Sequence, residues 1–538
     1  MMSDDHDPDG VRANLDQDFI PFHQARELLG KKSYQEVHSI CVEMIDQNPD
    51  YADAYYVLGI LFYEHHDFRN ALDLFERAVQ KGHPEPGVHA QLARCYLALS
   101  RPQEALAHIE MATARNPEDS YTLSSLGAAL SRLDRHEEAV ELHRKATELA
   151  PKDAFGFFNL GSSLQFLGDF DGAKAAYETA LQIAPEYLKA RAYLTLIKTH
   201  TREENDLPAL QDAWEKRHPR DAEGGLQIAH AFAKVYEDLG EPKSVMTWLD
   251  KGKSLVREVI PNRRVQDKAS FKAAKALSLT LKPDVDTIAD GPIFITGLPR
   301  TGTTLTDRIL SSHSQVVSAG ERTEFAACLQ RGAQQQGKHV LDAQTISMAT
   351  EVELSSVGAV YLDDVKAILN TSHRFTDKLP LNVFFAPAIL TALPSARMIC
   401  LRRHPVDSVL SVYRQLFALS AIEYRCAHDL QDLANFVADF YELVEHLSET
   451  LPASRFRIVD YETLATEPET EIRQLLEFCG LPFEEACLEF QKNRAPVATA
   501  SVAQVRQPMY TSSIARWERY KDHLGPALAV LNDRGLLD

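Results

Sequence analysis

The sequence has few cysteines and none of them are paired in a recognisable way. Its seven cysteines are scattered, and no C-x-x-C occurs. This argues against a disulfide framework and a cysteine-based zinc site, and it fits a reducing compartment. His65 and His66 are the only adjacent histidines, and no H-E-x-x-H motif is present. We therefore expect no bound metal.

Long apolar runs and an excess of positive charge are also missing. No apolar run approaches the roughly 20 residues of a membrane-spanning helix. The acidic stretch MMSDDHDPDG has no apolar signal-peptide core. With a formal net charge of −20, nucleic acid is not an expected partner, and an anionic ligand needs a local basic pocket. We expect a cytoplasmic protein without a membrane span.

A 34-residue period runs through the first half of the chain. Small residues recur where two antiparallel helices would cross closely, and a proline follows the second helix, which it cannot continue. This is the pattern of tetratricopeptide (TPR) repeats, and it predicts an all-α solenoid. Such an array can support a neighbouring domain or bind a peptide or protein partner, and both roles stay open. The residues in phase are Gly59, Ala93, Gly127 and Gly161; Ala71, Ala105, Ala139 and Ala173; Ala78, Ala112, Ala146 and Ala180; and Pro117, Pro151 and Pro185.

At 538 residues the chain is long enough for several domains. We expect a disordered N-terminus over 1–17 and a helical repeat domain over 18–262, with clear repeats at about 52–187. A charged helical piece and a Pro/Asp-rich connector over 263–290 predict an interdomain linker. Residues 291–538 then form an α/β domain with a P-loop-like parallel sheet. Its expected strands are 292–296, 315–318, 374–376, 397–401 and 455–460.

The α/β domain opens with a strand, a glycine-bounded turn and a helix. The turn, 297–304, reads GLPRTGTT. Backbone N–H groups and the positive end of the helix make such a turn a cradle for an anion. Its glycine spacing is that of the nucleotide P-loop, but Thr303 stands where the P-loop has the lysine that reaches the β- and γ-phosphates. This favours a nucleotide with a single 5′ phosphate arm over ATP or GTP.

The same turn resembles the 5′-phosphosulfate-binding loop of sulfotransferases that use 3′-phosphoadenosine 5′-phosphosulfate (PAPS). The stretch P-R-T-G-T-T after a strand carries this resemblance. It implies an α/β sulfotransferase domain with PAPS as cosubstrate. The residues that it implies in contact with PAPS are Pro299, Arg300, Thr301, Gly302, Thr303 and Thr304.

Two further segments resemble catalytic elements of tyrosylprotein sulfotransferases. A G-E-E-T-R stretch holds the catalytic glutamate there, and this chain has G-E-R-T-E from Gly320. Counting without gaps from Arg300 puts that glutamate on Glu321, and Glu324 is the second candidate. The resemblance implies that Glu321 is the general base, whereas the pattern alone favours a surface acid or a helix cap. Lys378 matches a K-x-P lysine that helps to neutralise the transferring sulfuryl group.

The end of the expected strand 397–401 resembles a motif that binds the 3′ phosphate. The motif has an arginine and a serine eight residues apart, which are Arg403 and Ser411 here. An arginine at a strand end forms a bidentate clamp, and the serine hydroxyl of the next helix can reach the same phosphate. We expect Arg402 to be an ion-pair residue instead. Tyr461 resembles the tyrosine of a Y-E-x-L element at the nucleotide pocket, with interior packing as the alternative.

The last resemblance lies near the C-terminal end. SVAQVRQP and IARW match, with the same spacing, an S-x-x-Q-V-x-x-P…L-x-K-W stretch of tyrosylprotein sulfotransferases. It implies that Ser501 acts on the transition state and that Arg516, in place of lysine, binds the cosubstrate. Five pieces in order over about 292–525 make the chain similar to a bacterial-type TPR–sulfotransferase fusion.

The resemblance implies transfer of a sulfuryl group from PAPS to an acceptor hydroxyl, without a metal. Arg300, Lys378 and Ser501 would stabilise charge, and Glu321 would take the proton. We expect a protein or peptide tyrosine as acceptor, with the TPR array binding a partner or the acceptor. The alternatives are a glycan or small phenol as acceptor, a P-loop phosphotransferase, and a TPR scaffold without activity. The sequence does not choose the acceptor or the oligomeric state.

Overall fold

The computed structural model describes residues 24–25, 28–29, 33–83, 86–285, 290–335, 341–371, 373–495 and 505–537. The N-terminus expected to be disordered, 1–17, and the expected catalytic Ser501 lie outside these residues. The chain divides into two compact units, 1–151 and 152–538.

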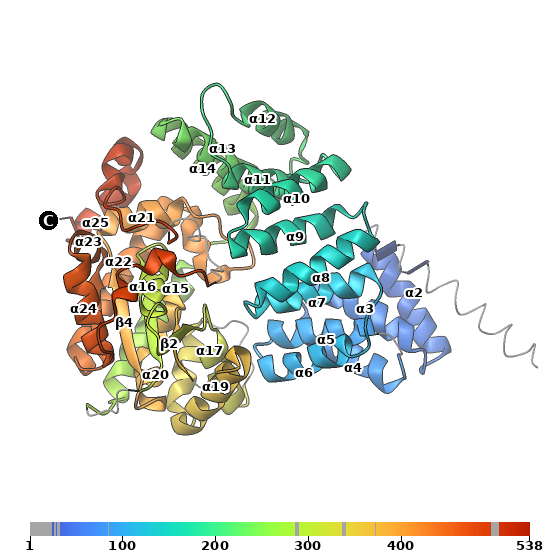
Figure 1. The fold of residues 1–538 in the computed structure, drawn as a ribbon, viewed down its shortest axis with the longest axis horizontal. Coiled ribbons are helices and arrows are strands. Elements are labelled where there is room, and N and C mark those ends of the chain that lie inside the picture. Colours follow the sequence, from blue (N-terminus) through green and yellow to red (C-terminus); the bar gives the residue numbers. More distant parts are fainter. Residues whose placement is uncertain are drawn as a thin grey trace, which may run out of the picture. The chain divides into compact units, whose positions relative to one another are not determined.

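The first unit consists of helices that pack in consecutive pairs (Figure 1). The recurring small residues explain how closely the two helices of a pair approach. A Cβ on Gly59 would lie 2.7 Å from Cε1 of Phe75, and a Cβ on Gly127 would lie 2.7 Å from Cε1 of His143. The repeat prediction is confirmed. The helices are α2 (Tyr34–Gln47), α3 (Ala52–Glu64), α4 (Phe68–Gln80), α5 (Pro86–Ala98), α6 (Pro102–Thr113), α7 (Ser120–Arg132) and α8 (His136–Leu149).

The second unit starts with more helices of the same kind. Gly161 packs on Tyr177 as Gly59 does on Phe75, since its Cβ would lie 2.6 Å from the ring. After this pair the helix lengths become irregular, with 10 residues in each of α11 and α12, 17 in α13 and 18 in α14. We call α9–α14 the helical region. They are α9 (Ala154–Leu167), α10 (Phe170–Ile183), α11 (Leu188–Ile197), α12 (Leu207–Lys216), α13 (Ala222–Asp238) and α14 (Pro242–Val259).

The segment expected to be a linker, 263–290, begins with a packed helix, α15 (Arg264–Thr280). Phe271 is buried and its ring lies 4.8 Å from that of Phe384, in the same core as Phe294. The chain therefore does not separate into compact units at this segment. Its apolar helix face is buried, which a charged composition alone did not indicate.

A five-stranded parallel sheet lies in the second unit, as predicted. The strand order is β2-β3-β1-β4-β5, and every neighbouring pair is parallel. The register pairs Ile295 with Ile399 and Leu401 with Val459. The carboxyl ends of all five strands thus share one edge, where ligands of open α/β sheets bind. The strands are β1 (Ile293–Gly297), β2 (Val316–Ser318), β3 (Arg374–Asp377), β4 (Arg397–Arg402) and β5 (Phe456–Asp460).

Helices cover the sheet and complete two cores (Figure 1). Side chains of a strand alternate between faces, so Phe294 of β1 joins one core while Ile293 and Ile295 join the other. The remaining α-helices are α16 (Thr303–Leu310), α17 (Glu324–Gly332), α18 (Ala343–Ser347), α19 (Leu354–Leu369), α20 (Ala386–Ala392), α21 (Pro405–Tyr413), α22 (Leu430–Thr450), α23 (Tyr461–Thr466), α24 (Pro468–Cys479) and α25 (Gly525–Asp533). The 3₁₀ helices among the described residues are η1 (Met348–Thr350), η2 (Pro380–Phe385), η3 (Ile422–His428), η4 (Glu485–Cys487), η5 (Phe490–Lys492) and η6 (Arg516–His523).

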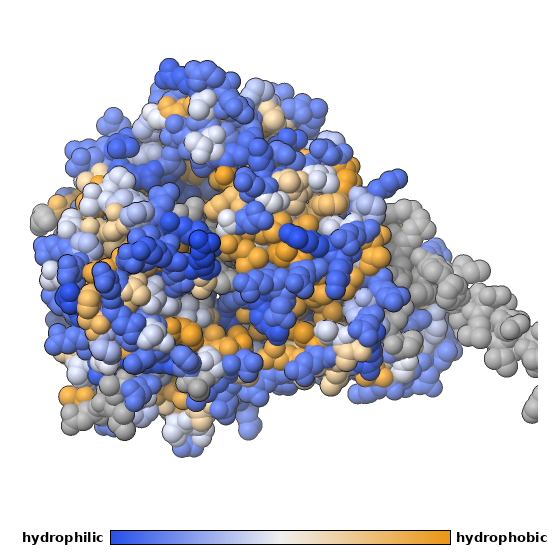
Figure 2. All heavy atoms as spheres, viewed as in Figure 1, coloured by the Kyte–Doolittle hydropathy of each residue, from blue (hydrophilic) through white to orange (hydrophobic). Residues whose placement is uncertain are grey.

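The surface and the cysteines bear on two sequence expectations. All seven cysteines are buried and free, so no disulfide framework exists. Within the part of the chain that is described, no helix is both long and apolar enough to cross a membrane. Figure 2 shows apolar surface exposed in places over the repeat helices. In the first unit, Met111, Tyr121 and Leu149 are exposed, but partner binding stays a prediction.

Candidate active site

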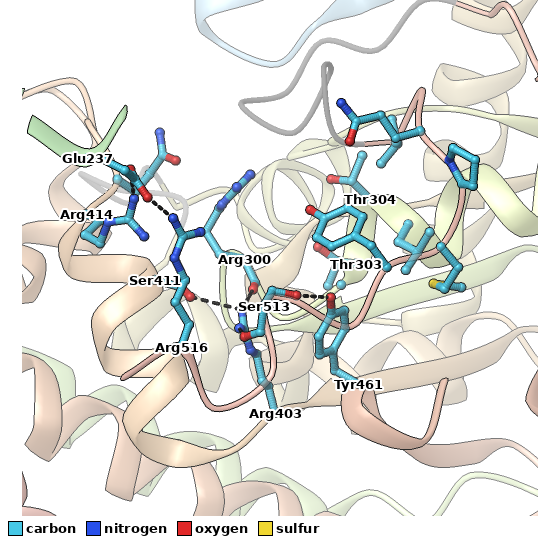
Figure 3. Close-up of a pocket in the computed structure, with 18 of the residues that line it drawn as sticks. Glu237, Arg300, Thr303, Thr304, Arg403, Ser411, Arg414, Tyr461, Ser513 and Arg516 are labelled. Atoms are coloured by element: carbon cyan, nitrogen blue, oxygen red, sulfur yellow. Dashed lines mark hydrogen bonds and ion pairs between the residues drawn. The ribbon is translucent and has the colours of Figure 1, made fainter. Parts of the chain in front are cut away.

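A cavity of about 540 Å³ opens at the carboxyl edge of the sheet. Its walls come from the turn after β1, the end of β4, α21, the start of α23, a C-terminal segment and α13 of the helical region (Figure 3). The sequence-predicted residues that it brings together are Arg300, Gly302, Thr303, Thr304, Arg403, Ser411, Tyr461 and Arg516.

The turn after β1 adopts a conformation that depends on its glycines. Gly302 has φ +103°, and a Cβ there would lie 2.8 Å from Cδ2 of Tyr461. Arg300 also has a positive φ, 68°. Thr301 is fully buried and donates to the carbonyl of Leu298 at 2.7 Å. Pro299 and Thr301 do not line the cavity, so their side chains shape the turn, whereas Arg300, Thr303 and Thr304 face the cavity.

Arg403 is the best-anchored cation of the cavity. It follows β4 and is only 6% exposed. Its guanidinium donates to Oγ of Ser411 at 3.0 Å, to the carbonyl of Arg300 at 3.2 Å and to the carbonyl of Ser513. Its Nε is buried and has no hydrogen-bond partner among the described residues, so one strong donor is left for an anion.

Tyr461 joins this cluster at the start of α23. Its ring lies 4.9 Å from the guanidinium carbon of Arg403, and its hydroxyl lies 2.6 Å from Oγ of Ser513. The tyrosine thus packs against Arg403 and lines the cavity at once, and its place at a nucleotide pocket stays a prediction. Burial lowers the pKa of the nearby Arg300 guanidinium, and the positive charge of Arg403 adds to this.

The neighbouring Arg402 has a different environment. It donates to both carboxylate oxygens of Asp460, at 2.7 and 3.1 Å, and to Glu445 at 2.6 Å. The prediction that Arg402 is an ion-pair residue is confirmed. Two adjacent arginines therefore point to opposite sides of β4, one into the cavity and one to an acidic surface pair.

Glu321 and Lys378 form an ion pair beyond the ends of β2 and β3. Lys378 is almost completely buried, while the side chain of Glu321 keeps 46% of its exposure. The backbone N–H of Lys378 donates to the carbonyl of Gly320 at 2.8 Å, which fixes the two strand ends side by side. Neither side chain lines the cavity itself. They lie on the β3 side of the β1 turn, and Arg403 and Tyr461 lie on its β4 side.

The second candidate base, Glu324, lies at the start of α17 and is 8% exposed. It neighbours Asp377, whose pKa burial raises to about 7, with the charge of Glu324 as a further cause. Asp307 of α16 is another buried carboxylate, and it accepts from Ser318 at 2.9 Å. Of these carboxylates, Glu321 is the most accessible.

Several cavity residues were missed in the sequence. Arg414 lies three residues after Ser411, so helical spacing could have indicated it. Glu237 carries no local signal because it comes from a distant part of the chain, and Tyr510 and Ser513 lie between the two C-terminal pieces that carry the resemblance, in neither of them. Glu237 forms ion pairs with Arg414 and with the predicted Arg516. No group of three or more potential metal ligands occurs among the described residues.

The sequence profile of the sulfotransferase family matches residues 292–485. Tetratricopeptide repeat profiles match 62–130, 121–150 and 154–187. The chain joins TPR repeats to a sulfotransferase domain. All five strands of the sheet, and the cavity residues from Arg300 to Tyr461, fall inside the matched sulfotransferase segment.

Curated relatives match the same half of the chain. An uncharacterized protein of Aquifex aeolicus is 38% identical over 246 residues, which are 45% of this chain and 32% of the relative. The protein-tyrosine sulfotransferase of Drosophila melanogaster is 23% identical over 234 residues, 42% of this chain and 46% of the enzyme. The chain thus spans a third to a half of the length of these two relatives.

Among solved structures, the sulfotransferase domain of the Synechococcus PCC 7002 olefin synthase is similar to this chain. It is 17% identical, with a TM-score of 0.31, and the similarity covers 46% of this chain and 97% of that domain.

Proposed function

We propose that this protein transfers a sulfuryl group from PAPS to an acceptor hydroxyl. The observation that carries the proposal is the pairing of Arg403 with Ser411 at 3.0 Å in the cavity that the β1 turn also lines. One cavity would thus bind both the 5′ phosphate arm and a second anion. ATP and GTP have no 3′ phosphate to occupy the second.

The β1 turn would hold the 5′ phosphosulfate. Thr303 and Thr304 begin α16 and line the cavity, so their hydroxyls and the positive helix end would bind the same anion. Arg300 adds a guanidinium to the lining of the same cavity. The absence of a P-loop lysine from this turn favours a sulfuryl over a triphosphate substrate.

The 3′ phosphate would lie against Arg403 and Ser411. The unpartnered Nε of Arg403 supports this, because a buried donor without a partner is costly unless a ligand accepts from it. The aromatic ring of Tyr461 beside Arg403 keeps the guanidinium in one orientation. Arg516, which lines the same cavity, would add positive charge.

Glu321 would act as the general base. The acceptor oxygen attacks sulfur in line, its proton passes to the Glu321 carboxylate, and the bond from sulfur to the 5′ phosphate oxygen breaks. Lys378 is paired with Glu321 and would help to neutralise the charge of the sulfuryl oxygens. Arg300 would stabilise the negative charge left on the 5′ phosphate, and Ser501 remains a candidate for the same task.

A protein or peptide tyrosine is the acceptor that we favour. The support is the similarity to the protein-tyrosine sulfotransferase of Drosophila melanogaster and the presence of TPR repeats, which can present a peptide-binding surface.

The cosubstrate is tested by thermal unfolding with 3′-phosphoadenosine 5′-phosphate (PAP), ATP and AMP. A ligand that binds only the native protein stabilises it by about 2.7 kcal/mol at 100 times its Kd. We expect PAP to raise the midpoint far more than equal concentrations of ATP or AMP. Stabilisation by ATP with Mg²⁺ and none by PAP would indicate a phosphotransferase instead, and no response to any nucleotide would favour a scaffold.

The acceptor is tested by incubating the protein with radiolabelled PAPS and a peptide that contains one tyrosine. The matched control is the same peptide with phenylalanine in that position. Label in the tyrosine peptide alone supports the proposal. Label transferred to a small phenol or a glycan but not to the peptide would keep sulfotransfer and reject the tyrosine acceptor.

A further inference from the structure

One wall of the nucleotide cavity comes from the helical region and not from the sulfotransferase domain. Lys234, Glu237 and Asp238, near the end of α13, all line the cavity. Figure 3 shows Glu237 facing Arg414 and Arg516, with dashed lines to both. The helical region therefore brings its own charges to a site that the sulfotransferase domain otherwise builds.

Glu237 divides its carboxylate between two arginines. Its Oε2 pairs with Nη2 of Arg414, and its Oε1 pairs with Nη2 of Arg516. The three side chains are 22%, 17% and 32% exposed, so solvent screens these pairs only partly. The neighbouring Asp238 differs, since it pairs with Lys234 and accepts from the backbone of His200 at 3.0 Å, both within the helical region.

The two arginines lie beside the second anion site of the cavity. Arg414 comes directly after α21, one helical turn beyond Ser411, which pairs with Arg403. Arg516 lines the same cavity as Ser411. A phosphate bound by Arg403 and Ser411 would therefore come close to the guanidinium groups that Glu237 holds.

We propose that Glu237 competes with the 3′ phosphate of the nucleotide for Arg414 and Arg516, and so lowers the affinity of the site for 3′-phosphorylated nucleotides. The inference rests on the proposed function. Two effects of the Glu237 carboxylate both weaken the binding of the phosphate. The carboxylate repels a nearby phosphate, and it neutralises the arginines that would otherwise attract that phosphate.

The helical region thereby forms part of the nucleotide site in addition to supporting the sulfotransferase domain. A displacement of α13 would separate Glu237 from the arginines and change the nucleotide affinity. The sulfotransferase domain taken alone would lack this carboxylate.

The test compares the variant Glu237→Gln with the wild-type protein by isothermal titration calorimetry with PAP and with AMP. Glutamine keeps the size of the side chain and removes its charge. We expect PAP to bind on the order of tenfold more tightly, whereas AMP, which has no 3′ phosphate, changes less than twofold. Glu241→Gln is the matched control, because Glu241 is exposed and lies just beyond α13. This variant should bind both nucleotides like the wild type.

Unchanged or weaker PAP binding by Glu237→Gln would overturn the inference, as would an equal gain for AMP. A second variant, Glu237→Ala, must give the same direction, and circular dichroism checks that both variants are folded. Titration of the wild-type protein tests the proposed function separately from the role of Glu237. If it does not bind PAP at all, the proposed function fails, whereas a wild type that binds PAP and a variant that gains nothing reject only the role of Glu237.

Discussion

Replacement of Arg403 by lysine tests the site where it is most specific. Arg403 is 6% exposed and donates to Ser411 and to the carbonyls of Arg300 and Ser513. Lysine keeps the charge but has no planar fork, so it cannot hold these contacts and donate two bonds to a phosphate. The variant therefore separates the effect of geometry from the effect of charge.

The expected magnitude follows from the donors that are lost. A hydrogen bond to a charged group contributes about 1.5–3 kcal/mol. Losing one such bond weakens PAP binding by roughly 1.5–3 kcal/mol, which is about 10- to 150-fold, and losing two weakens it further. The affinity for AMP should decrease much less, because the only phosphate of AMP is expected at the β1 turn.

The assay is calorimetric titration of PAP and AMP, with Arg402→Lys as the matched control. Arg402 is the adjacent residue, but its contacts are Asp460 and Glu445. We expect this control to bind PAP like the wild type. Equal losses for PAP and AMP in Arg403→Lys, or a loss below threefold for PAP, would refute the assignment of Arg403 to the 3′ phosphate.

Three further changes probe the turn, the base and the core. Gly302→Ala should destabilise the protein by about 1–3 kcal/mol and reduce PAP binding, because the residue has φ +103° and its Cβ would meet Tyr461 at 2.8 Å. The control Gly525→Ala, which has open space around the new Cβ, should change neither the unfolding free energy in a denaturation assay nor PAP affinity in a binding assay. Glu321→Gln should lower turnover by about 10²- to 10⁴-fold with PAP binding unchanged, and retained turnover would exclude it as the base. Burial lowers the pKa of Lys253 to about 7, so the unfolded chain binds more protons between pH 7 and about pH 10.4, and wild-type stability rises with pH in that window. The unfolding free energy that Lys253→Met gains over the wild type, measured by denaturant unfolding, should therefore decrease by about 2 kcal/mol from pH 7 to pH 9. A gain that does not depend on pH would contradict this.

The secondary structure around the site was predictable because its signals are local. The apolar run before Gly297, the 34-residue period and the strand before Arg403 each depend on neighbours a few residues apart. The packing of the segment that begins with α15 was less predictable. The charged sequence of α15 hides an apolar face that is recognised only when Phe271 is seen packed on Phe384.

Within the site, motif spacing indicated the residues that follow strands, since parallel strands bring their carboxyl ends to one edge. Arg300, Arg403 and Tyr461 meet in the cavity for this reason. The sequence did not show that Glu321 and Lys378 form an ion pair beside the cavity, because this depends on the order of β2 and β3 beside β1.

The sequence by itself determined the repeats, the five strands and the turn after β1, since each follows from residues close together in the chain. Only the tertiary structure decided which charges face one another across the cavity. Glu237 precedes the β1 turn by some 60 residues, and Arg516 follows it by more than 200. No periodicity or motif connects positions so far apart. The packing of α13 beside the C-terminal segment places them within ion-pair distance.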